Sequence, residues 1–348
     1  MLPSVHSLMA LRGSPRQCGK CYGENQAEML RIYLKNIPHG GFNSDRRRYA
    51  QQCWRILHRW DGSVAEFLRG MARGSGLPLD EICALLCREE FGHTHHCTAM
   101  GATGAATRNG AAIIAQSWDD SPHNYPAVQL LRLQSDGAPA TLTYAMPGGR
   151  WAAAGINEHG LALVWTSAGM QPLVKPRPGV PTYALIAGLL GCRDCAAAIA
   201  LVRRTRNAGS FIFFIADAGG EVWVLEAIPG RVDVVPCRDL ATRANHYQCG
   251  AICAAAKQKL PRAGVKWNSQ CRARRIAVLA EQSRGYIDGP AIQTIYRDHE
   301  PRPGLCICQH ADPGTAMSLD SFYAVPARKE LWIARGYPCR HCFARYKV

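Results

Sequence analysis

Apolar side chains in the early part of the chain recur at spacings of three and four residues, which is the periodicity of amphipathic helices. The pattern covers most of residues 24–90. It is clearest in Glu28–Lys35, in Arg46–Arg59 and, after Pro78, in Leu79–Glu90. Proline is common at a helix start, which supports the last of these segments. We therefore predict that this region is mainly helical.

The pattern changes after Cys97, where small residues and glycines fill positions 98–110. Asn109-Gly110 is typical of a tight turn between strands. Short runs rich in β-branched and aromatic residues follow, and such runs indicate strands. The predicted strands are Ala111–Trp118, Val128–Leu133, Thr141–Ala145, Leu161–Thr166, Ser210–Ala216, Glu221–Ile228, Val232–Val235, Ala316–Ala324 and Glu330–Ala334.

Pairs of helical patterns interrupt these strands. They are Thr182–Leu190 with Asp194–Arg203, and Gln270–Gly285 with Pro290–Asp298. Runs of strands separated by pairs of helices, without regular strand–helix alternation, predict an α+β fold with mostly antiparallel sheets. The change in character at Cys97 is a natural seam between a helix-rich part and a strand-rich part.

Composition allows a large buried core. Of the 348 residues, 47% are hydrophobic and 19% are charged, an ordinary globular balance. No apolar run approaches the ~18 residues expected of a membrane-spanning helix. The first residues lack the basic start and long apolar stretch of a signal peptide. We therefore predict a cytoplasmic protein.

Basic residues outnumber acidic ones, 41 to 26, giving a net charge of +15. Such a surplus favours anionic partners. The basic clusters are short: Arg46–Arg48, then Arg203-Arg204 with Arg206, and Arg272 with Arg274-Arg275. The last two groups are predicted to lie on solvent-exposed helix faces. Because no nucleic-acid-binding motif accompanies them, no nucleic-acid partner is expected.

Sixteen cysteines are many for a cytosolic chain. Disulfides are not expected without an export signal. A zinc site built from Cys18 and Cys21 with Cys339, His341 and Cys342 requires the two ends of the chain to meet. Most of the cysteines are instead predicted to be small buried hydrophobic residues, and no bound metal is expected. The close pairs are Cys18/Cys21, Cys192/Cys195, Cys306/Cys308 and Cys339/Cys342.

Cys97 is the main candidate for chemistry. It precedes a stretch of small residues, and a strand-like run some twenty residues later ends in Gln116-Ser117-Trp118-Asp119, which returns an acid near it. If the chain is cut before Cys97, the cysteine gains a free α-amino group, which titrates near ~7.7–8.0. Such an amine can activate the adjacent nucleophile.

Short motifs in a fixed order extend this interpretation over residues 13–342. Through their order and spacing, the chain resembles the acyl-coenzyme A:6-aminopenicillanic acid acyltransferase (isopenicillin N acyltransferase) family of N-terminal-nucleophile hydrolases. The motifs are Gly13–Gly19, Leu77–Ile82, Arg88–Glu90, His96–Thr98, Gln116–Asp119, Gly155–Leu161, Asn245-His246 and Ala334–Cys339.

The resemblance implies a four-layer αββα fold, in which two antiparallel sheets are flanked by helices. It also implies that the precursor cleaves itself between His96 and Cys97, with Thr98 helping to position the scissile carbonyl. The products would be a helix-rich small chain, residues 1–96, and a catalytic chain, residues 97–348, that begins at the nucleophile. The small chain would remain bound, so that the two form one composite domain.

The resemblance also implies roles for polar residues. Asp119 would orient the new amine of Cys97. Asn245 and Asn157 would hold the oxyanion, because side-chain amides supply N–H donors without titrating. Asn157 is equally well explained as a turn residue before Gly160.

Two further residues are expected to support the site, namely Gln116 and His246. Related bile-salt hydrolases carry arginine at the position of Gln116, so glutamine here matches the acyltransferase branch. The family also has a late arginine linked to the site. The stretch Gln309–Thr315 contains no arginine, and the sequence leaves this residue unplaced.

The function implied is that of an amidohydrolase or acyltransferase. Cys97 would form a thioester with the acyl group of a small acyl amide and pass it to water or to an amine. No cofactor is expected, although an acyl-coenzyme A is an alternative acyl donor for transfer to an amine. The substrate's acyl and amine groups and the oligomeric state are not determined by the sequence.

Two other interpretations stay open at this point. Cys97 could act without cleavage in a Cys–His pair, with His246, His93, His95 or His96 as the base. Alternatively, the chain could be a non-catalytic basic protein that binds zinc or nucleic acid.

Overall fold

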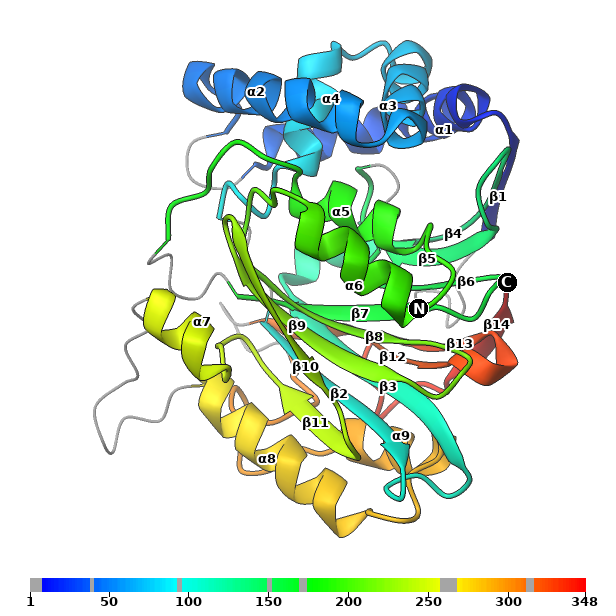
Figure 1. The fold of residues 1–348 in the computed structure, drawn as a ribbon, viewed down its shortest axis with the longest axis vertical. Coiled ribbons are helices and arrows are strands. Elements are labelled where there is room, and N and C mark those ends of the chain that lie inside the picture. Colours follow the sequence, from blue (N-terminus) through cyan, green and yellow to red (C-terminus); the bar gives the residue numbers. More distant parts are fainter. Residues whose placement is uncertain are drawn as a thin grey trace.

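The computed structural model describes residues 8–37, 41–92, 96–148, 152–168, 174–256, 268–310 and 316–348. Two β-sheets pack face to face at the centre, and helices cover the outer face of each (Figure 1). The layers therefore follow the order α, β, β, α, which confirms the predicted fold class.

The larger sheet has eight strands in the order β1-β4-β5-β6-β7-β8-β9-β10. Neighbouring strands are antiparallel, except that β1 runs parallel to β4. The strands are β1 (Leu8–Gly13), β4 (Gln129–Ser135), β5 (Thr141–Ala145), β6 (Ala154–Asn157), β7 (Ala162–Ser167), β8 (Phe211–Ala216), β9 (Val222–Ile228) and β10 (Arg231–Pro236).

The smaller sheet has six strands in the order β11-β2-β3-β12-β13-β14, and every pair is antiparallel. Strand β2 lies between β11 and β3, and Cys97 on β2 pairs with Trp118 on β3. The candidate nucleophile is therefore on an inner strand. The strands are β2 (His96–Gly104), β3 (Gly110–Asp120), β11 (Leu240–Arg243), β12 (Met317–Val325), β13 (Glu330–Arg335) and β14 (Ala344–Lys347).

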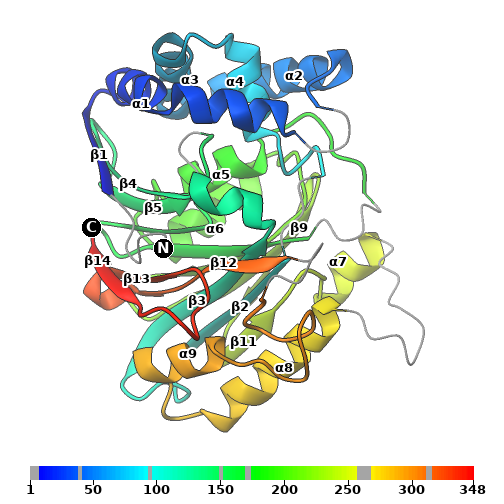
Figure 2. The same ribbon diagram turned by 180° about the vertical axis from the view of Figure 1, so that it is seen from behind.

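Helices α1 to α6 lie on the side of the eight-stranded sheet, and α8 and α9 cover the six-stranded sheet (Figure 2). Two short 3-10 helices, Pro122–Ala127 and Pro326–Arg328, occur in connections between strands. The helices are α1 (Pro15–Lys35), α2 (Ser44–Trp60), α3 (Gly62–Ser75), α4 (Leu79–Leu86), α5 (Thr182–Leu189), α6 (Cys195–Arg204), α7 (Gly250–Ala255), α8 (Asn268–Gln282) and α9 (Gly289–Tyr296).

Local sequence explains where several helices begin. Ser14 accepts a hydrogen bond from the Gln17 backbone N–H, and the Gln17 side chain accepts one from the Ser14 backbone, which is a reciprocal capping box. Asp61, Asp194 and Asp288 cap α3, α6 and α9 in the same N-terminal position. Each side chain satisfies an N–H that has no partner within its helix.

Glycines allow α1 and α3 to touch at the backbone. A Cβ atom on Gly19 would collide with the carbonyl of Phe67, and one on Gly70 would collide with the carbonyl of Arg16. Because backbone atoms cannot move aside as a flexible side chain can, larger residues at these positions would force the two helices apart. This contact fixes the packing of the first helical layer.

The predicted strands and helices are all present, but the sequence did not indicate β1, β2, β6, β11 and β14. Strand β2 was missed because small residues carry little strand propensity of their own. Its small residues are explained by packing, because β2 lies against strands β8 and β9 of the larger sheet. A Cβ on Gly101 would lie 2.8 Å from Val222 Cγ1 and 3.1 Å from Phe214 Cδ1. Contacts with the other sheet, rather than local strand propensity, therefore explain the small residues of β2.

The residues before Cys97 share a core with those after it. Leu11, Leu30 and Phe67 belong to the same buried apolar cluster as Cys97 and Trp118. Strand β1 adds to the larger sheet beside β4. A backbone break beside Cys97 would thus leave the earlier segment held by a strand pairing and by buried contacts.

Among the described residues, no helix is both long enough and apolar enough to cross a membrane.

Candidate active site

Cys97 is buried near the start of β2, with 2% of its surface exposed. Its backbone N–H donates a hydrogen bond to Asn245 Oδ1 over 3.0 Å. Asn245 follows β11 in the chain, and β11 pairs with β2. The strand pairing therefore brings the asparagine to the nitrogen that cleavage would convert into an amine.

Arg272, on α8, is fully buried and joins four groups at this position. Its Nη1 donates to the carbonyl oxygen of Cys97 and, over 2.7 Å, to Thr98 Oγ1. Its Nη2 donates to Asn245 Oδ1 and its Nε to Asn268 Oδ1, each over 2.7 Å. A guanidinium presents five N–H donors in a rigid planar fork. One side chain thus holds the backbone of Cys97 and the amide that contacts it.

The prediction that the basic cluster on α8 faces solvent is wrong for Arg272. Arg274, two residues later, is exposed, whereas Arg272 shares a buried face with Ser269, Ala273 and Ile276. The sequence signal for its burial was that Arg272 lies three residues after Ser269 and four before Ile276, on the same face of the helix. The other cluster is as predicted, because Arg203, Arg204 and Arg206 are exposed.

Asp119, at the end of β3, pairs with His96 across the β2–β3 ladder and is fully buried. Its Oδ1 accepts hydrogen bonds from Ser117 Oγ over 2.6 Å and from Ser318 Oγ over 2.7 Å. Its Oδ2 is also buried and accepts no hydrogen bond from the described residues. The carboxylate is therefore fixed through Oδ1, while Oδ2 can still accept a hydrogen bond.

Burial dominates the electrostatics of both Asp119 and Cys97. It raises the pKa of Asp119 to about 6, although the positive charge of Arg272 and the two serine hydrogen bonds act in the opposite direction. Burial and then the Asp119 charge raise the pKa of the Cys97 thiol well above its usual range, while Arg272 lowers it. The thiol of the uncut chain is thus neutral at physiological pH.

A pH-dependent stability follows for Asp119 in the uncut chain. Its pKa is about 6 when folded, against the ordinary value of 3.8. Between these values the folded state holds a proton that the unfolded state has lost, so stability falls as pH rises. The shift corresponds to about 3 kcal/mol. In an uncut Cys97→Ala background, Asp119→Asn should therefore gain about that much relative stability between pH 3 and pH 7.

Urea unfolding of the two proteins at each pH measures this difference. Other titrating groups are common to both proteins, so their contributions cancel. A stability difference that does not change with pH would show that Asp119 titrates with its ordinary pKa.

Asn245 is held by groups on both sides of the predicted cleavage bond. Its Nδ2 donates to the carbonyl oxygen of Ser167 over 2.9 Å. The Ser167 hydroxyl in turn donates to Glu89 Oε1, and Glu89 is a buried acid of the N-terminal segment. The site therefore depends on both segments. In this geometry the amide oxygen of Asn245 faces Cys97, and its role as an oxyanion donor stays a prediction.

The supporting residues lie in a second layer around the site. Gln116 Oε1 accepts from the Trp165 backbone N–H over 2.7 Å and so joins β3 to β7 of the other sheet. His246 Nδ1 lies 2.7 Å from Ser269 Oγ, which accepts the backbone N–H of Asn245 over 2.8 Å. Burial lowers the pKa of His246 to about 4, so its ring is neutral at physiological pH. The supporting role of these two residues stays a prediction. His93 and His95 lie outside the described residues.

The structure does not bring Asn157 into this group. Its Nδ2 donates to the carbonyl oxygens of Leu190, over 2.9 Å, and Cys192, over 2.7 Å. Its Oδ1 accepts the backbone N–H groups of His159 and Leu161, each over 3.0 Å. Asn157 thus closes the β6–β7 turn against the end of α5, which is the turn interpretation offered by the sequence.

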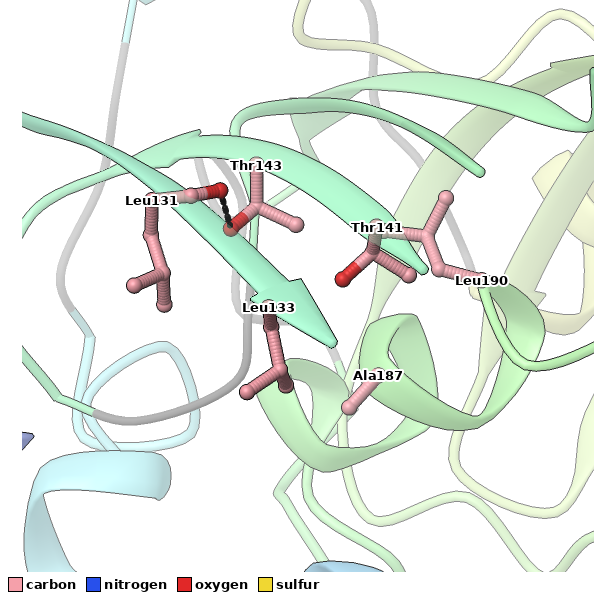
Figure 3. Close-up of a pocket in the computed structure, with 6 residues that line it drawn as sticks. All are labelled: Leu131, Leu133, Thr141, Thr143, Ala187 and Leu190. Atoms are coloured by element: carbon pink, nitrogen blue, oxygen red, sulfur yellow. Dashed lines mark hydrogen bonds between the residues drawn. The ribbon is translucent and has the colours of Figure 1, made fainter. Parts of the chain in front are cut away.

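Two cavities in the described part of the chain are lined by residues outside the Cys97 site. One, of about 10 Å³, lies between β4, β5 and α5 (Figure 3) and has room for about one water molecule. The other, of about 400 Å³, lies beside α9, β12 and β13.

The four-layer αββα fold is the one that the resemblance to N-terminal-nucleophile hydrolases implied. Residues 105–300 match the family described as acyl-coenzyme A:6-aminopenicillanic acid acyl-transferase, and the chain belongs to this family. The matched region begins after Cys97 and includes Asp119, Asn245 and Arg272. The protein is therefore an amidohydrolase or acyltransferase of the N-terminal-nucleophile type.

The chain is also similar to several solved structures. A mutant of conjugated bile acid hydrolase from Clostridium perfringens is 10% identical, with 72% of this chain and 97% of that chain covered and a TM-score of 0.46. The N-acylethanolamine-hydrolyzing acid amidase ortholog of Caenorhabditis elegans is 12% identical over 66% and 93%, with a TM-score of 0.46. Penicillin V acylase from Agrobacterium tumefaciens is 14% identical over 68% and 82%, with a TM-score of 0.42. No curated protein sequence matches the chain.

Proposed function

We propose that the protein cleaves its own backbone between His96 and Cys97 and then uses Cys97 to hydrolyse a small acyl amide. One observation carries this proposal. The backbone nitrogen of Cys97 is bound by Asn245, and Arg272 bonds both to that asparagine and to the Cys97 carbonyl. A structural cysteine has no need of such a buried polar setting, since it usually behaves as a small hydrophobic residue.

Self-cleavage would begin with attack of Cys97 Sγ on the carbonyl carbon of His96. The S–C bond forms, the C–N bond to Cys97 breaks, and the thiol proton ends on the departing nitrogen. Water then hydrolyses the thioester, which leaves a carboxylate on His96 and restores the thiol. Asn245 Oδ1 and Asp119 Oδ2 are acceptors suited to hold the protonated amine.

Turnover would repeat this chemistry on an external amide. The Cys97 amine takes the thiol proton as the sulfur attacks the acyl carbon, and the same proton passes to the leaving amine. Water attacks the resulting thioester and releases the acid. Arg272 stabilises the developing thiolate, because it is a buried positive charge hydrogen-bonded to the Cys97 carbonyl and it lowers the pKa of the thiol.

Transfer to an amine differs only in the second step, where an amine replaces water. An acyl-coenzyme A could then load Cys97 directly as a thioester donor. The surplus of 41 basic over 26 acidic residues suits an anionic donor of this kind. We place hydrolysis first because it needs no second substrate site.

Mass spectrometry of the purified wild-type protein tests the proposal. Two chains that meet between His96 and Cys97 are expected. Short incubation with a panel of acyl amides and an acyl-coenzyme A, followed by acid quenching, should then add the mass of one acyl group to the chain that begins at Cys97. An uncut chain with thiol-dependent amidase activity would instead favour the Cys–His interpretation.

A further inference from the structure

Two histidines and two cysteines from separate stretches of the chain meet away from Cys97. His299 follows α9, Cys308 and His310 lie before β12, and Cys339 lies between β13 and β14. The Nε2 atoms of the two histidines are 3.1 Å apart, and His310 Nε2 is 3.2 Å from Cys339 Sγ. All four potential ligand atoms lie within 4.8 Å of one another. We call this group the Cys2His2 cluster.

We propose that the Cys2His2 cluster binds one zinc ion. Zinc takes four ligands in a tetrahedron, at ~2.3 Å from sulfur and ~2.0–2.1 Å from nitrogen, which places neighbouring ligand atoms about 3.3–3.8 Å apart. The observed separations of 3.1 and 3.2 Å come within a few tenths of an ångström of that range. Two thiolates with two imidazoles select zinc over magnesium or calcium, which prefer oxygen.

The exposure of the four residues suits a metal that enters from one side. Cys308 is buried, His310 and Cys339 are half-buried, and His299 is exposed. The exposed histidine can turn aside to admit the ion and then close the site. Because four protein side chains leave no open coordination position, this zinc would be structural.

The backbone around the cluster is already positioned by other contacts. The Cys308 N–H donates to the carbonyl oxygen of Asp298 over 2.9 Å, and Arg275 on α8 donates to both carboxylate oxygens of Asp298 over 2.9 and 2.5 Å. The His310 ring stacks on Tyr337 with centroids 4.2 Å apart. Such contacts around metal ligands set the orientation of the rings and reduce the entropy lost on binding.

The cluster is also connected to the active-site carboxylate. Ser117 Oγ lies 3.4 Å from the carbonyl oxygen of Ile307, and the Gln309 N–H donates to Ser318 Oγ over 2.9 Å. These are the two serines that hold Asp119 Oδ1. A zinc ion bound to Cys308 and His310 would brace the segment between them, and with it the serines.

This ligand set differs from the one that the cysteine pairs indicated. Cys18 is buried in α1, where its Sγ lies 3.5 Å from the carbonyl oxygen of Gly13. Cys342 is exposed, and the structure groups Cys339 with Cys308 and the two histidines instead. Within the part of the chain that the structure describes, this is the group with metal-binding geometry.

Zinc analysis of the full-length protein, purified with zinc and then passed through a weak chelator, tests the proposal. About one equivalent per chain is expected. Cys308→Ser and Cys339→Ser should lose it, and His299→Asn should bind it more weakly. Cys342→Ser is the matched control and should keep it. Removal of zinc from the wild type with a strong chelator should lower its melting temperature, because the ion binds only the folded state.

If a cysteine variant does not fold, alkylation of the wild-type protein with and without zinc tests the same ligands. Zinc should protect Cys308 and Cys339 from iodoacetamide and leave Cys21 and Cys342 reactive. The proposal is overturned if the zinc-loaded wild type retains no more metal than Cys308→Ser, if Cys342→Ser loses the metal, or if Cys308 and Cys339 are found as a disulfide. Each readout is independent of self-cleavage and amidase activity.

Discussion

Cys97→Ala should leave the protein as one chain of 348 residues, whereas the wild type should separate into residues 1–96 and 97–348. Without the sulfur there is no atom to take the acyl group from the His96–Cys97 bond. Amidase or acyltransferase activity should also be lost, since removal of a catalytic nucleophile typically lowers kcat on the order of 10⁶-fold. Intact-mass measurement and an acyl-amide assay on the same preparations provide both readouts.

Cys237→Ala is the matched control for this experiment. Cys237 is also buried, and its Sγ lies 3.6 Å from the carbonyl oxygen of Gly101 on β2, the strand that carries Cys97. This variant should still cleave itself. Cleavage of Cys97→Ala at the same bond would refute the mechanism, and an uncut Cys237→Ala would show that damage to β2 alone prevents it.

Arg272→Met should slow self-cleavage by at least about 10²–10³-fold, which is the usual loss when one preorganised donor is removed. The substitution keeps most of the volume but removes hydrogen bonds to Cys97, Thr98, Asn245 and Asn268. It also removes the charge that lowers the pKa values of Asp119 and of the thiol. Asp119 should then be protonated at higher pH and be less able to hold the amine.

Cell-free synthesis followed by a time course of the 1–96 fragment measures this rate directly. Arg272→Lys should restore part of it, because a single ammonium replaces the charge but not the four-way set of hydrogen bonds. Arg274→Met is the control, since Arg274 is exposed on the same helix. Wild-type cleavage in Arg272→Met would mean that this arginine only supports the fold, and thermal unfolding of the variant separates the two explanations.

The fold class was predictable because periodicity reports which face of each element is buried. Thr141–Ala145 was predicted with the bounds that the structure has, and the helix expected at Thr182–Leu190 ends within one residue of the observed one. Strand β2 could not be found this way. Its alanines and glycines carry no alternation, and it is a strand because it pairs with β11 and β3. Its small residue Gly101 leaves room for Phe214 and Val222 of the other sheet.

The candidate site likewise contains residues that the sequence predicted and residues that it missed. Cys97 and Asp119 were predicted together because a strand-like run after Cys97 ends in an acid and because the family resemblance gives both residues a role. In the structure, the β2–β3 ladder pairs Asp119 with His96, the neighbour of Cys97. Arg272 was missed, although its spacing was visible, because a buried arginine requires partners that lie far away in sequence. Asn157 had a suitable side chain and motif, but its hydrogen bonds serve the turn in which it lies.

The sequence by itself determined the type and order of most elements, and it predicted a nucleophile and an acid close to it. These depend on contacts between residues close together in the chain, where local geometry leaves few alternatives. Only the tertiary structure decided that α8 turns Arg272 inward, that Glu89 supports Asn245 through Ser167, and that His299, Cys308, His310 and Cys339 meet. Such groupings arise from how whole elements pack, and periodicity within one element does not specify which other element it will touch.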